Sequence, residues 1–266
     1  MHEVLSTLIE RLDDPASSET NIIGWGSPVP FFGDLSRSSV ATLGLNPSNR
    51  EFVDVEGNEL HGASRRFHSL SSLRLTRWSD AEQEHQELIA DYCRSYFLRN
   101  PYDGWFRELN HLISGTGASY YDASAQACHL DLIPYATACK WTDLTSFQRS
   151  TLLALAGDTL GILLRDSPIR LLILNGQTVV DNLQKLADTR FEKEAIPDWT
   201  LPRRSSSGVM GYAFMGAVRY LAGVRLKREV IVLGFNHNIQ SSFGMTLLVK
   251  AGIRRWITQA AHEVSS

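Results

Sequence analysis

The chain is poor in cysteine and has no long apolar segment. Its three cysteines, Cys93, Cys128 and Cys139, are odd in number, widely spaced and not arranged as CxxC. This spacing indicates neither a disulfide framework nor a zinc or iron–sulfur site, so we expect no metal, no cofactor and a cytoplasmic location. No apolar run approaches the length of a membrane span, and the charged residues 1–12 are unlike a signal peptide. We therefore expect no association with a membrane.

The chain also lacks an excess of positive charge, internal repeats and low-complexity tracts. Because its formal net charge is −3, any contact with phosphate groups has to come from local basic patches. Its 266 residues, 43% of them hydrophobic, are enough for a sizeable core. We expect a single domain over residues 1–266, with a long polar loop inserted at about 50–78 and no obligate protein partner evident.

Four short apolar runs predict buried strands, at 40–45, 127–133, 169–174 and 230–233. Helices are expected between and around them, at 4–12, 79–97 with Ser79 as N-cap, 102–113, 146–164, 178–186 and about 244–263. Residues 198–219 are expected to form a loop and hairpin. Continuous apolar strands that alternate with helices are typical of a parallel sheet covered on both faces. The predicted fold is therefore α/β, with three layers and a central parallel four-stranded sheet.

Polar side chains stand where the predicted strands end. They are Asn46, Asp131, Asn175 and His237. The carboxyl ends of parallel strands meet along one edge of a sheet, where open α/β sheets bind ligands, so we expect these residues to form a small polar site. Each also has a structural interpretation: a turn asparagine bonded to its own backbone, a loop histidine, or an aspartate paired with a nearby cation.

Four motifs in order resemble those of the uracil-DNA glycosylase superfamily. The motifs are Gly44-Leu45-Asn46-Pro47-Ser48, which is similar to the Gly-x-Asn-Pro-Gly of the single-strand-selective and mismatch-specific branches, His129-Leu130-Asp131-Leu132-Ile133-Pro134, Leu174-Asn175-Gly176, and Asn236-His237-Asn238-Ile239-Gln240-Ser241-Ser242. Their order and spacing cover residues 25–262. Two departures stand out: Asp131 replaces the base-reading Asn of the family, and Asn238-Ile239 replaces the Pro-Ser that follows its histidine.

The resemblance implies a DNA glycosylase, which hydrolyses the N-glycosidic bond of a flipped-out base and leaves an abasic site. Asn46 would orient the attacking water, because an amide positions a water molecule rather than deprotonating it. His237 would donate a hydrogen bond to O2 of the leaving base. Gly44, Leu45 and Asn175 would line the base pocket. No lysine is placed for a Schiff base, so a monofunctional hydrolase is expected.

Asp131 bears on the identity of the base. An Asn at this position donates to O4 of uracil and accepts from its N3–H, whereas a carboxylate accepts from the 4-amino group of cytosine. A protonated carboxyl can also donate to N3, and burial favours protonation. Asp131 therefore favours cytosine or a 5-modified cytosine over uracil.

A glycosylase that removed ordinary cytosine would destroy its host genome, so a second requirement at C5 is expected. The superfamily includes anti-phage members that remove hypermodified cytosines, and the loop at 50–78 is expected to supply the extra pocket. Phe52 and Phe67 are candidates for stacking on the base, although core packing explains them equally well. Contact with DNA is predicted for Ser48, Arg65, Arg66, Arg203, Arg204, Asn238, Gln240 and Ser241, with Gln240 or Phe243 as a wedge; solvated loops are the alternative interpretation.

Three functions follow from these observations. The first is a glycosylase for modified cytosine, such as glucosylated hydroxymethylcytosine, that acts on phage DNA in antiviral defence. The second is a repair glycosylase for uracil or another deaminated base. The third is a reader of modified DNA without catalysis, since Asn46 is a weaker group than an Asp and the loop around His237 is altered.

Overall fold

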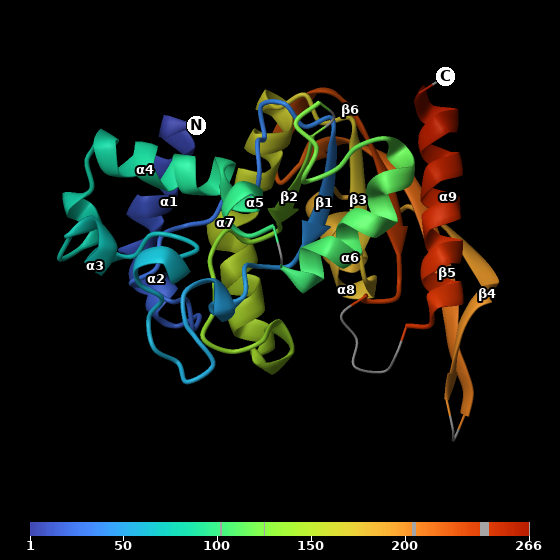
Figure 1. Cartoon of the computed structure of the whole chain (residues 1–266), viewed down its shortest axis with the longest axis horizontal. Helices are drawn as coiled ribbons and strands as arrows, with labels where there is room; N and C mark the ends of the chain where they lie inside the picture. Colours follow the sequence, from blue (N-terminus) through green and yellow to red (C-terminus); the bar gives the residue numbers. More distant parts are fainter. Residues whose placement is uncertain (102, 125, 204–205, 240–244, 266) are drawn as a thin grey trace.

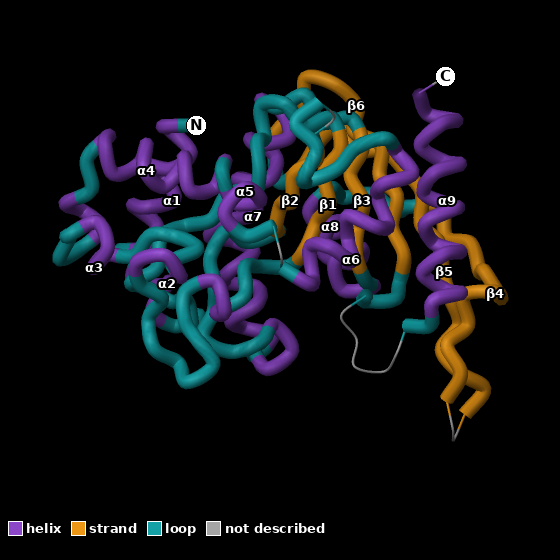
Figure 2. Tube along the Cα trace, in the orientation of Figure 1, coloured by secondary structure: helices purple, strands orange, loops and turns teal. Residues whose placement is uncertain are grey.

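The computed structural model describes residues 1–101, 103–124, 126–203, 206–239 and 245–265, and it contains one six-stranded sheet (Figures 1 and 2). The strand order is β2-β1-β3-β6-β5-β4. The strands are β1 (Val40–Gly44), β2 (Ala127–Asp131), β3 (Leu171–Asn175), β4 (Glu192–Arg203), β5 (Ser206–Leu221) and β6 (Val224–Phe235). Strands β2, β1, β3 and β6 run parallel, while β5 and β4 are antiparallel. The chain is thus an α/β protein with a mixed sheet.

The four parallel strands confirm the prediction from the apolar runs. Every residue of β1, β2 and β3 is buried, as expected for strands that are covered on both faces. The register aligns their carboxyl ends: Gly44 pairs with Asp131, and Asn175 pairs with Phe235 at the end of β6. This alignment brings the ends of all four strands to one edge of the sheet.

The sheet is wider than the four strands that the sequence predicted. Residues 198–219 were expected to be loop and hairpin, but β4 and β5 form a long hairpin that begins at Glu192 and extends the sheet beyond β6. Ala213 pairs with Phe235, so residues 206–212 of the hairpin continue past the end of β6. Figure 1 shows this hairpin projecting from the body of the molecule. It projects on the side where the parallel strands end.

Helices cover both faces of the sheet. Helix α6 (Gly104–Ile113) and helix α9 (Leu247–Ser265) pack together on one face, where Phe106 of α6 contacts His129 of β2. On the other face lie α7 (Ser146–Asp166) and α8 (Gln177–Leu186), and Val180 of α8 packs against Gly234 of β6. No helix within the described ranges is long and apolar enough to cross a membrane.

The remaining helices lie beside this layered body. They are α1 (His2–Leu12), α2 (Pro15–Ser18), α3 (Leu70–Leu73), α4 (Gln83–Arg94) and α5 (Tyr96–Arg99), with 3-10 turns at Asn49–Glu51, Gly62–Ser64, Trp78–Asp80, Ser114–Thr116 and Trp141–Asp143. The prediction of Ser79 as an N-cap was wrong. Helix α4 starts later, after Glu82, because Glu82 and His85 form a reciprocal capping box there.

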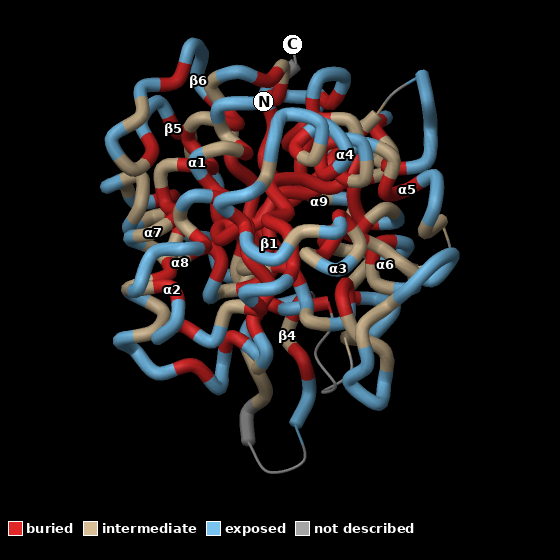
Figure 3. The backbone as a smooth tube through the Cα atoms, turned by 90° about the vertical axis from the view of Figure 1, so that its left-hand side faces the viewer, coloured by how far each residue is buried: buried red, intermediate tan, exposed pale blue. Residues whose placement is uncertain are grey.

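The segment 50–78 is irregular, as predicted, but its large aromatic side chains are not solvated. Phe52, Phe67 and Trp78 are buried, and the indole Nε1–H of Trp78 donates to the carbonyl of Gly24 at 2.7 Å. Figure 3 shows that buried backbone is concentrated around β1 and that exposed segments lie at the periphery. Residues 50–78 therefore extend the hydrophobic core beyond the sheet.

Candidate functional site

The carboxyl ends of β2 and β1 place Asp131 directly beside Gly44. The two residues are register partners, and Asp131 is only 6% exposed. A Cβ atom built on Gly44 would lie 2.3 Å from Asp131 Oδ1 and 3.0 Å from His129 Nε2. The missing side chain of Gly44 therefore makes room for the Asp131 carboxyl group, a use of glycine different from the approach of a ligand that we expected.

His129 lies two residues before Asp131 on β2, so its side chain is on the same face of the sheet. Its Nε2 atom is 3.4 Å from Asp131 Oδ1, and its Nδ1 atom is 2.6 Å from the hydroxyl of Thr42 on β1. Thr42 also contacts the hydroxyl of Tyr120 at 2.5 Å. Sequence reasoning missed His129, although the two-residue period of a strand places it on the face of Asp131.

Asn46 lies two residues beyond the end of β1, and its amide nitrogen is anchored. Asn46 Nδ2 donates to Thr137 Oγ1 at 3.0 Å, to the carbonyl of Pro47 at 3.1 Å and to that of Tyr135 at 3.4 Å. These contacts hold Nδ2 toward the protein. Within the described part of the chain, Asn46 Oδ1 accepts no hydrogen bond, so it is available to a water molecule.

His237 is buried behind β4. Its ring is 4% exposed, and Nε2 lies 2.7 Å from the carbonyl oxygen of Trp199. Because a carbonyl oxygen only accepts, Nε2 carries the proton. Burial lowers the pKa of the ring, although the bond to Trp199 opposes this, so the ring is neutral at pH 7. In this arrangement the single N–H of His237 is already donated to the backbone.

The other residues predicted to line the base pocket have structural contacts. Asn175 Oδ1 accepts from the backbone N–H of Ile239 at 3.2 Å, which ties the loop after β6 to the end of β3. Phe67 stacks on Tyr96 with ring centroids 5.3 Å apart, and Phe52 packs edge-to-face with Trp25. Leu45 is half-buried, and its carbonyl accepts from the N–H of Ile133. Core packing thus accounts for both phenylalanines.

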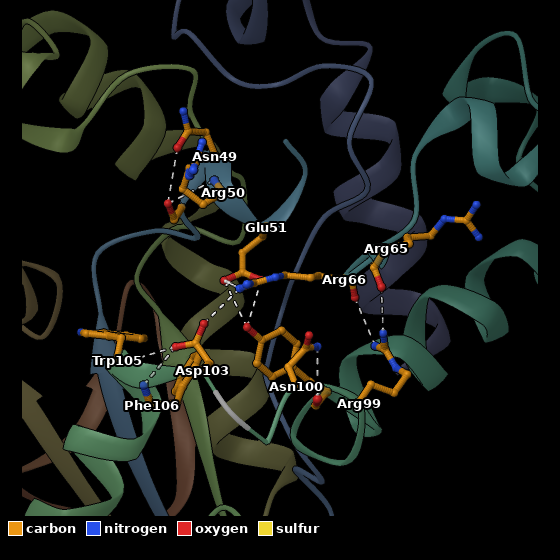
Figure 4. A network of polar contacts seen from close by, with 12 residues as sticks. Asn49, Arg50, Glu51, Arg65, Arg66, Arg99, Asn100, Asp103, Trp105 and Phe106 are labelled. Atoms are coloured by element: carbon orange, nitrogen blue, oxygen red, sulfur yellow. Dashed lines mark hydrogen bonds and ion pairs between the residues drawn. The ribbon is translucent and has the colours of Figure 1, made fainter. Parts of the chain in front are cut away.

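A buried carboxyl group lies in the loop that follows Asn46 (Figure 4). Glu51 is 7% exposed and accepts from the hydroxyl of Tyr96 at 3.1 and 3.0 Å. Burial raises the pKa of Glu51 to about 7, even though Arg66 at 3.6 Å and Tyr96 act in the opposite direction. Arg66 also donates to Asp103 at 3.0 Å, and Asp103 caps the start of α6. This network connects the loop after β1 to helix α6.

The residues predicted to contact DNA do not form one patch. Arg66 faces Glu51 and Asp103, whereas the guanidinium group of Arg65 points away from them (Figure 4). Ser48 caps the 3-10 turn at Asn49–Glu51, and Arg203 is exposed at the end of β4. Asn238 lies against Gly176 at the start of α8. Arg204, Gln240, Ser241 and Phe243 lie outside the described residues.

A surface groove lies away from this edge. It has a volume of about 460 Å³ and is lined by Ala127, Gln126, Tyr120, Arg37 and Arg94, among other residues. Ala127 begins β2 and Asp131 ends it, so the groove opens at the opposite end of the strand. Because Asp131, Asn175 and His237 are buried, any ligand needs a local opening to reach them. The polar chemistry, rather than the groove, defines the candidate site.

Comparison with models of known protein families and with curated proteins finds no match to this chain. In the described ranges, no group of three His, Cys, Asp or Glu side chains is arranged to hold a metal ion. The fold and the site together define an α/β protein with a mixed sheet and a buried carboxylate–imidazole pair at the carboxyl edge of its parallel strands.

Proposed function

We propose that this chain is a monofunctional DNA glycosylase that removes a flipped-out modified cytosine from phage DNA and leaves an abasic site. The observation that carries the proposal is the buried carboxyl group of Asp131 at the end of β2, beside Gly44. The position is the one at which the uracil-DNA glycosylase superfamily, which the chain resembles, reads its base. A carboxylate there accepts from an exocyclic amino group, which cytosine has and uracil lacks.

The reaction needs a water molecule on one side of the sugar and, on the other side, a group that stabilises the negative charge of the leaving base. As the bond between C1′ and the base breaks, the sugar gains positive charge and the base keeps the electron pair. Asn46 Oδ1, which faces no described donor, would orient the water that bonds to C1′, while the contacts of Nδ2 keep the amide in place. The proton released from the water leaves with the base or with solvent.

His237 has to change partners to stabilise the leaving base. Its N–H is donated to Trp199 in the structure, so the ring must turn away from that carbonyl group before it can donate to O2 of the base. The same contact supports a second candidate, a non-catalytic reader of modified DNA, in which His237 keeps a structural role and Asp131 still selects the base.

A base-release assay tests the proposed substrate. The protein is incubated with matched oligonucleotides that carry cytosine, 5-hydroxymethylcytosine, its glucosylated form or uracil, and alkali-labile sites and free base are measured. We expect release of the modified cytosine, and we expect Asp131→Asn to shift the preference toward uracil by about tenfold or more. Release of uracil by the wild type, with a profile unchanged in Asp131→Asn, would contradict the assignment.

Asn46→Ala separates the enzyme from the reader. For a glycosylase, we expect this variant to lose about a hundredfold in rate while its binding to the same oligonucleotide changes little, because the water is positioned only for the reaction. Asn182→Ala is a matched control, since Asn182 is partly exposed on α8 and its side chain donates to the carbonyl of Thr178 in the same helix. Selective binding of modified DNA with no release of base by any form of the protein would favour the reader.

A further inference from the structure

A chain of buried polar contacts, two of them hydrogen bonds, runs across the sheet and ends at Asp131. It starts at the hydroxyl of Tyr120, passes through Thr42 Oγ1 to His129 Nδ1, and continues from His129 Nε2 to Asp131 Oδ1. All four residues are buried, and Thr42 and His129 are register partners on neighbouring strands. Neither Tyr120, Thr42 nor His129 has a role in the proposed reaction.

Satisfying each buried donor sets the direction of these hydrogen bonds. Thr42 is the partner of the Tyr120 hydroxyl among the described residues, so the phenolic proton is donated to Thr42 Oγ1; the reverse direction would leave a buried O–H without an acceptor. Thr42 then donates its own proton to His129 Nδ1. A ring nitrogen that accepts carries no proton, so the proton of neutral His129 is on Nε2. Nε2 is the ring nitrogen that lies 3.4 Å from Asp131 Oδ1.

The surroundings of His129 hold its ring in this orientation. The rings of Trp105, Phe106 and Phe32 pack against the imidazole, with centroids 5.0, 5.2 and 5.4 Å from it. The backbone of His129 exchanges two hydrogen bonds with that of Phe32, each at 2.9 Å. The imidazole is thus locked on both sides, and its Nε2 cannot turn away from Asp131 without a change in the packing of α6.

We infer that His129 is a specificity-determining positioning residue, which holds Asp131 as a hydrogen-bond acceptor and so restricts the site to bases with an exocyclic amino group. The 3.4 Å separation is longer than the roughly 2.9 Å of an ordinary N–H···O bond, so a small movement of Asp131 toward His129 completes the hydrogen bond. With His129 donating, Asp131 Oδ1 is oriented and the other oxygen remains for the amino group. The O4 atom of uracil, also an acceptor, would face that oxygen without a proton between them.

This inference rests on the proposed function, but its first test does not need catalysis. Long-range proton–nitrogen spectra of the ¹⁵N-labelled protein report which nitrogen of each histidine carries the proton, and loss of one signal in His129→Gln identifies His129. We expect the Nε2–H tautomer in the wild type and a mixture of tautomers in Thr42→Val, which keeps the shape of Thr42 but removes its proton. An Nδ1–H tautomer in the wild type, or no change in Thr42→Val, would overturn the inference.

The second test measures selectivity, the ratio of modified cytosine to uracil. His129→Gln keeps an N–H donor near the position of Nε2, so we expect the ratio to be preserved, whereas His129→Leu should lower it about tenfold. The control is His111→Leu, an exposed histidine on α6. An equal ratio in His129→Leu and the wild type would contradict the role of His129. Thermal unfolding of each variant identifies any that fails to fold.

The two proposals fail in different ways. If the wild type releases no base from any oligonucleotide, the glycosylase proposal fails, and the same ratio is then measured as binding to the same oligonucleotides. If the wild type releases modified cytosine but both His129 variants keep its selectivity, the glycosylase proposal stands and the role of His129 is wrong.

Discussion

Glu51 and His68 are two buried ionisable residues, and the shifts of their pKa values have opposite effects on the pH dependence of stability. Burial raises the pKa of Glu51 from its ordinary 4.5 to about 7. Burial, helped by the positive charges of Arg65 and Arg99, lowers the pKa of His68 from 6.5 to about 4. Between about pH 4.5 and 7 the folded state holds the Glu51 proton more tightly than the unfolded state does, so this contribution to stability is lost as the pH rises. The ring of His68 becomes protonated more readily in the unfolded state than in the folded state. The free energy of unfolding therefore decreases as the pH falls from 6.5 to about 4.

These opposed contributions predict that Glu51→Gln changes the pH dependence of unfolding. In the wild type the two terms offset each other between about pH 4.5 and 6.5. In the variant the His68 term remains, so we expect the free energy of unfolding to rise with pH over this range by at most about 3 kcal/mol. Urea unfolding at several pH values measures it. Glu56→Gln, at an exposed position, is the control, and parallel curves for Glu51→Gln and the wild type would contradict the prediction.

Among individual residues, the sequence predicted part of the candidate site. Asn46 and Asn175 were singled out because each is a polar residue directly after an apolar run, and Asp131 because it stands near the end of its predicted strand. His129 was missed because it lies inside such a run, where a histidine is usually a packed core residue. Its importance depends on Thr42 and Tyr120, which are far apart in the sequence and meet only through the pairing of β1 with β2.

Among the elements, the β4–β5 hairpin connects the edge of the sheet to the candidate site. Asn236 follows β6, and its side chain accepts from the N–H of Tyr212 and donates to the carbonyl of Met210, both at 2.8 Å. His237 bonds to Trp199 on the other strand of the hairpin. The loop that carries the proposed catalytic histidine is therefore held by both strands of the hairpin.

We predict that Asn236→Ala loosens the hairpin without unfolding the sheet. The variant leaves the Met210 carbonyl and the Tyr212 N–H without their side-chain partner, at a cost of about 1–3 kcal/mol. Hydrogen exchange should become faster at Tyr212 and in the adjoining residues of β4 and β5, while β1 and β3 remain protected. Asn182→Ala is again the control. Unchanged exchange at Tyr212 would show that the backbone pairing alone holds the hairpin.

The elements differ in how well their sequences predict them. The parallel strands are short, mostly apolar and buried throughout, so β1, β2 and β3 were predicted within about two residues at each end. The hairpin strands were not, because β4 is mostly exposed and lacks a regular alternation of buried and exposed residues. Its pairing is determined by the neighbouring β5 and by α9, where Gly252 packs against Trp199. Tertiary contacts of this kind leave little trace in a local pattern.

The whole molecule carries a formal net charge of −3, and several arginines face other protein groups. Arg66 bonds to Asp103, Arg11 to Asp158, and Arg99 to backbone carbonyl groups. Because the net charge is negative and these guanidinium groups are engaged within the protein, we expect phosphate contacts to contribute little to the proposed complex with DNA. Such a protein has to gain its affinity mainly from the flipped base and the pocket around it.

We therefore predict a shallow salt dependence of binding to DNA. The slope of log K against log salt concentration should have a magnitude of about 3 or less, which corresponds to about three phosphate contacts. Fluorescence anisotropy at salt concentrations between about 50 and 200 mM measures this slope. Arg203→Gln, at the end of the hairpin that continues past β6, should lower the magnitude by about 1, whereas Arg219→Gln, near the other end of the hairpin, should not. A slope of about 6 or steeper would contradict the prediction.

The position of β1 between β2 and β3 also has a consequence for biosynthesis. Val40 pairs with Ala127 on one side and with Leu171 on the other, so both neighbours of this strand are translated after it. At about 5–20 residues per second, the apolar strand leaves the ribosome many seconds before its second partner exists. The nascent chain therefore leaves Val40–Gly44 without its second neighbour until Leu171–Asn175 has been synthesised, and the centre of the sheet closes only after that point.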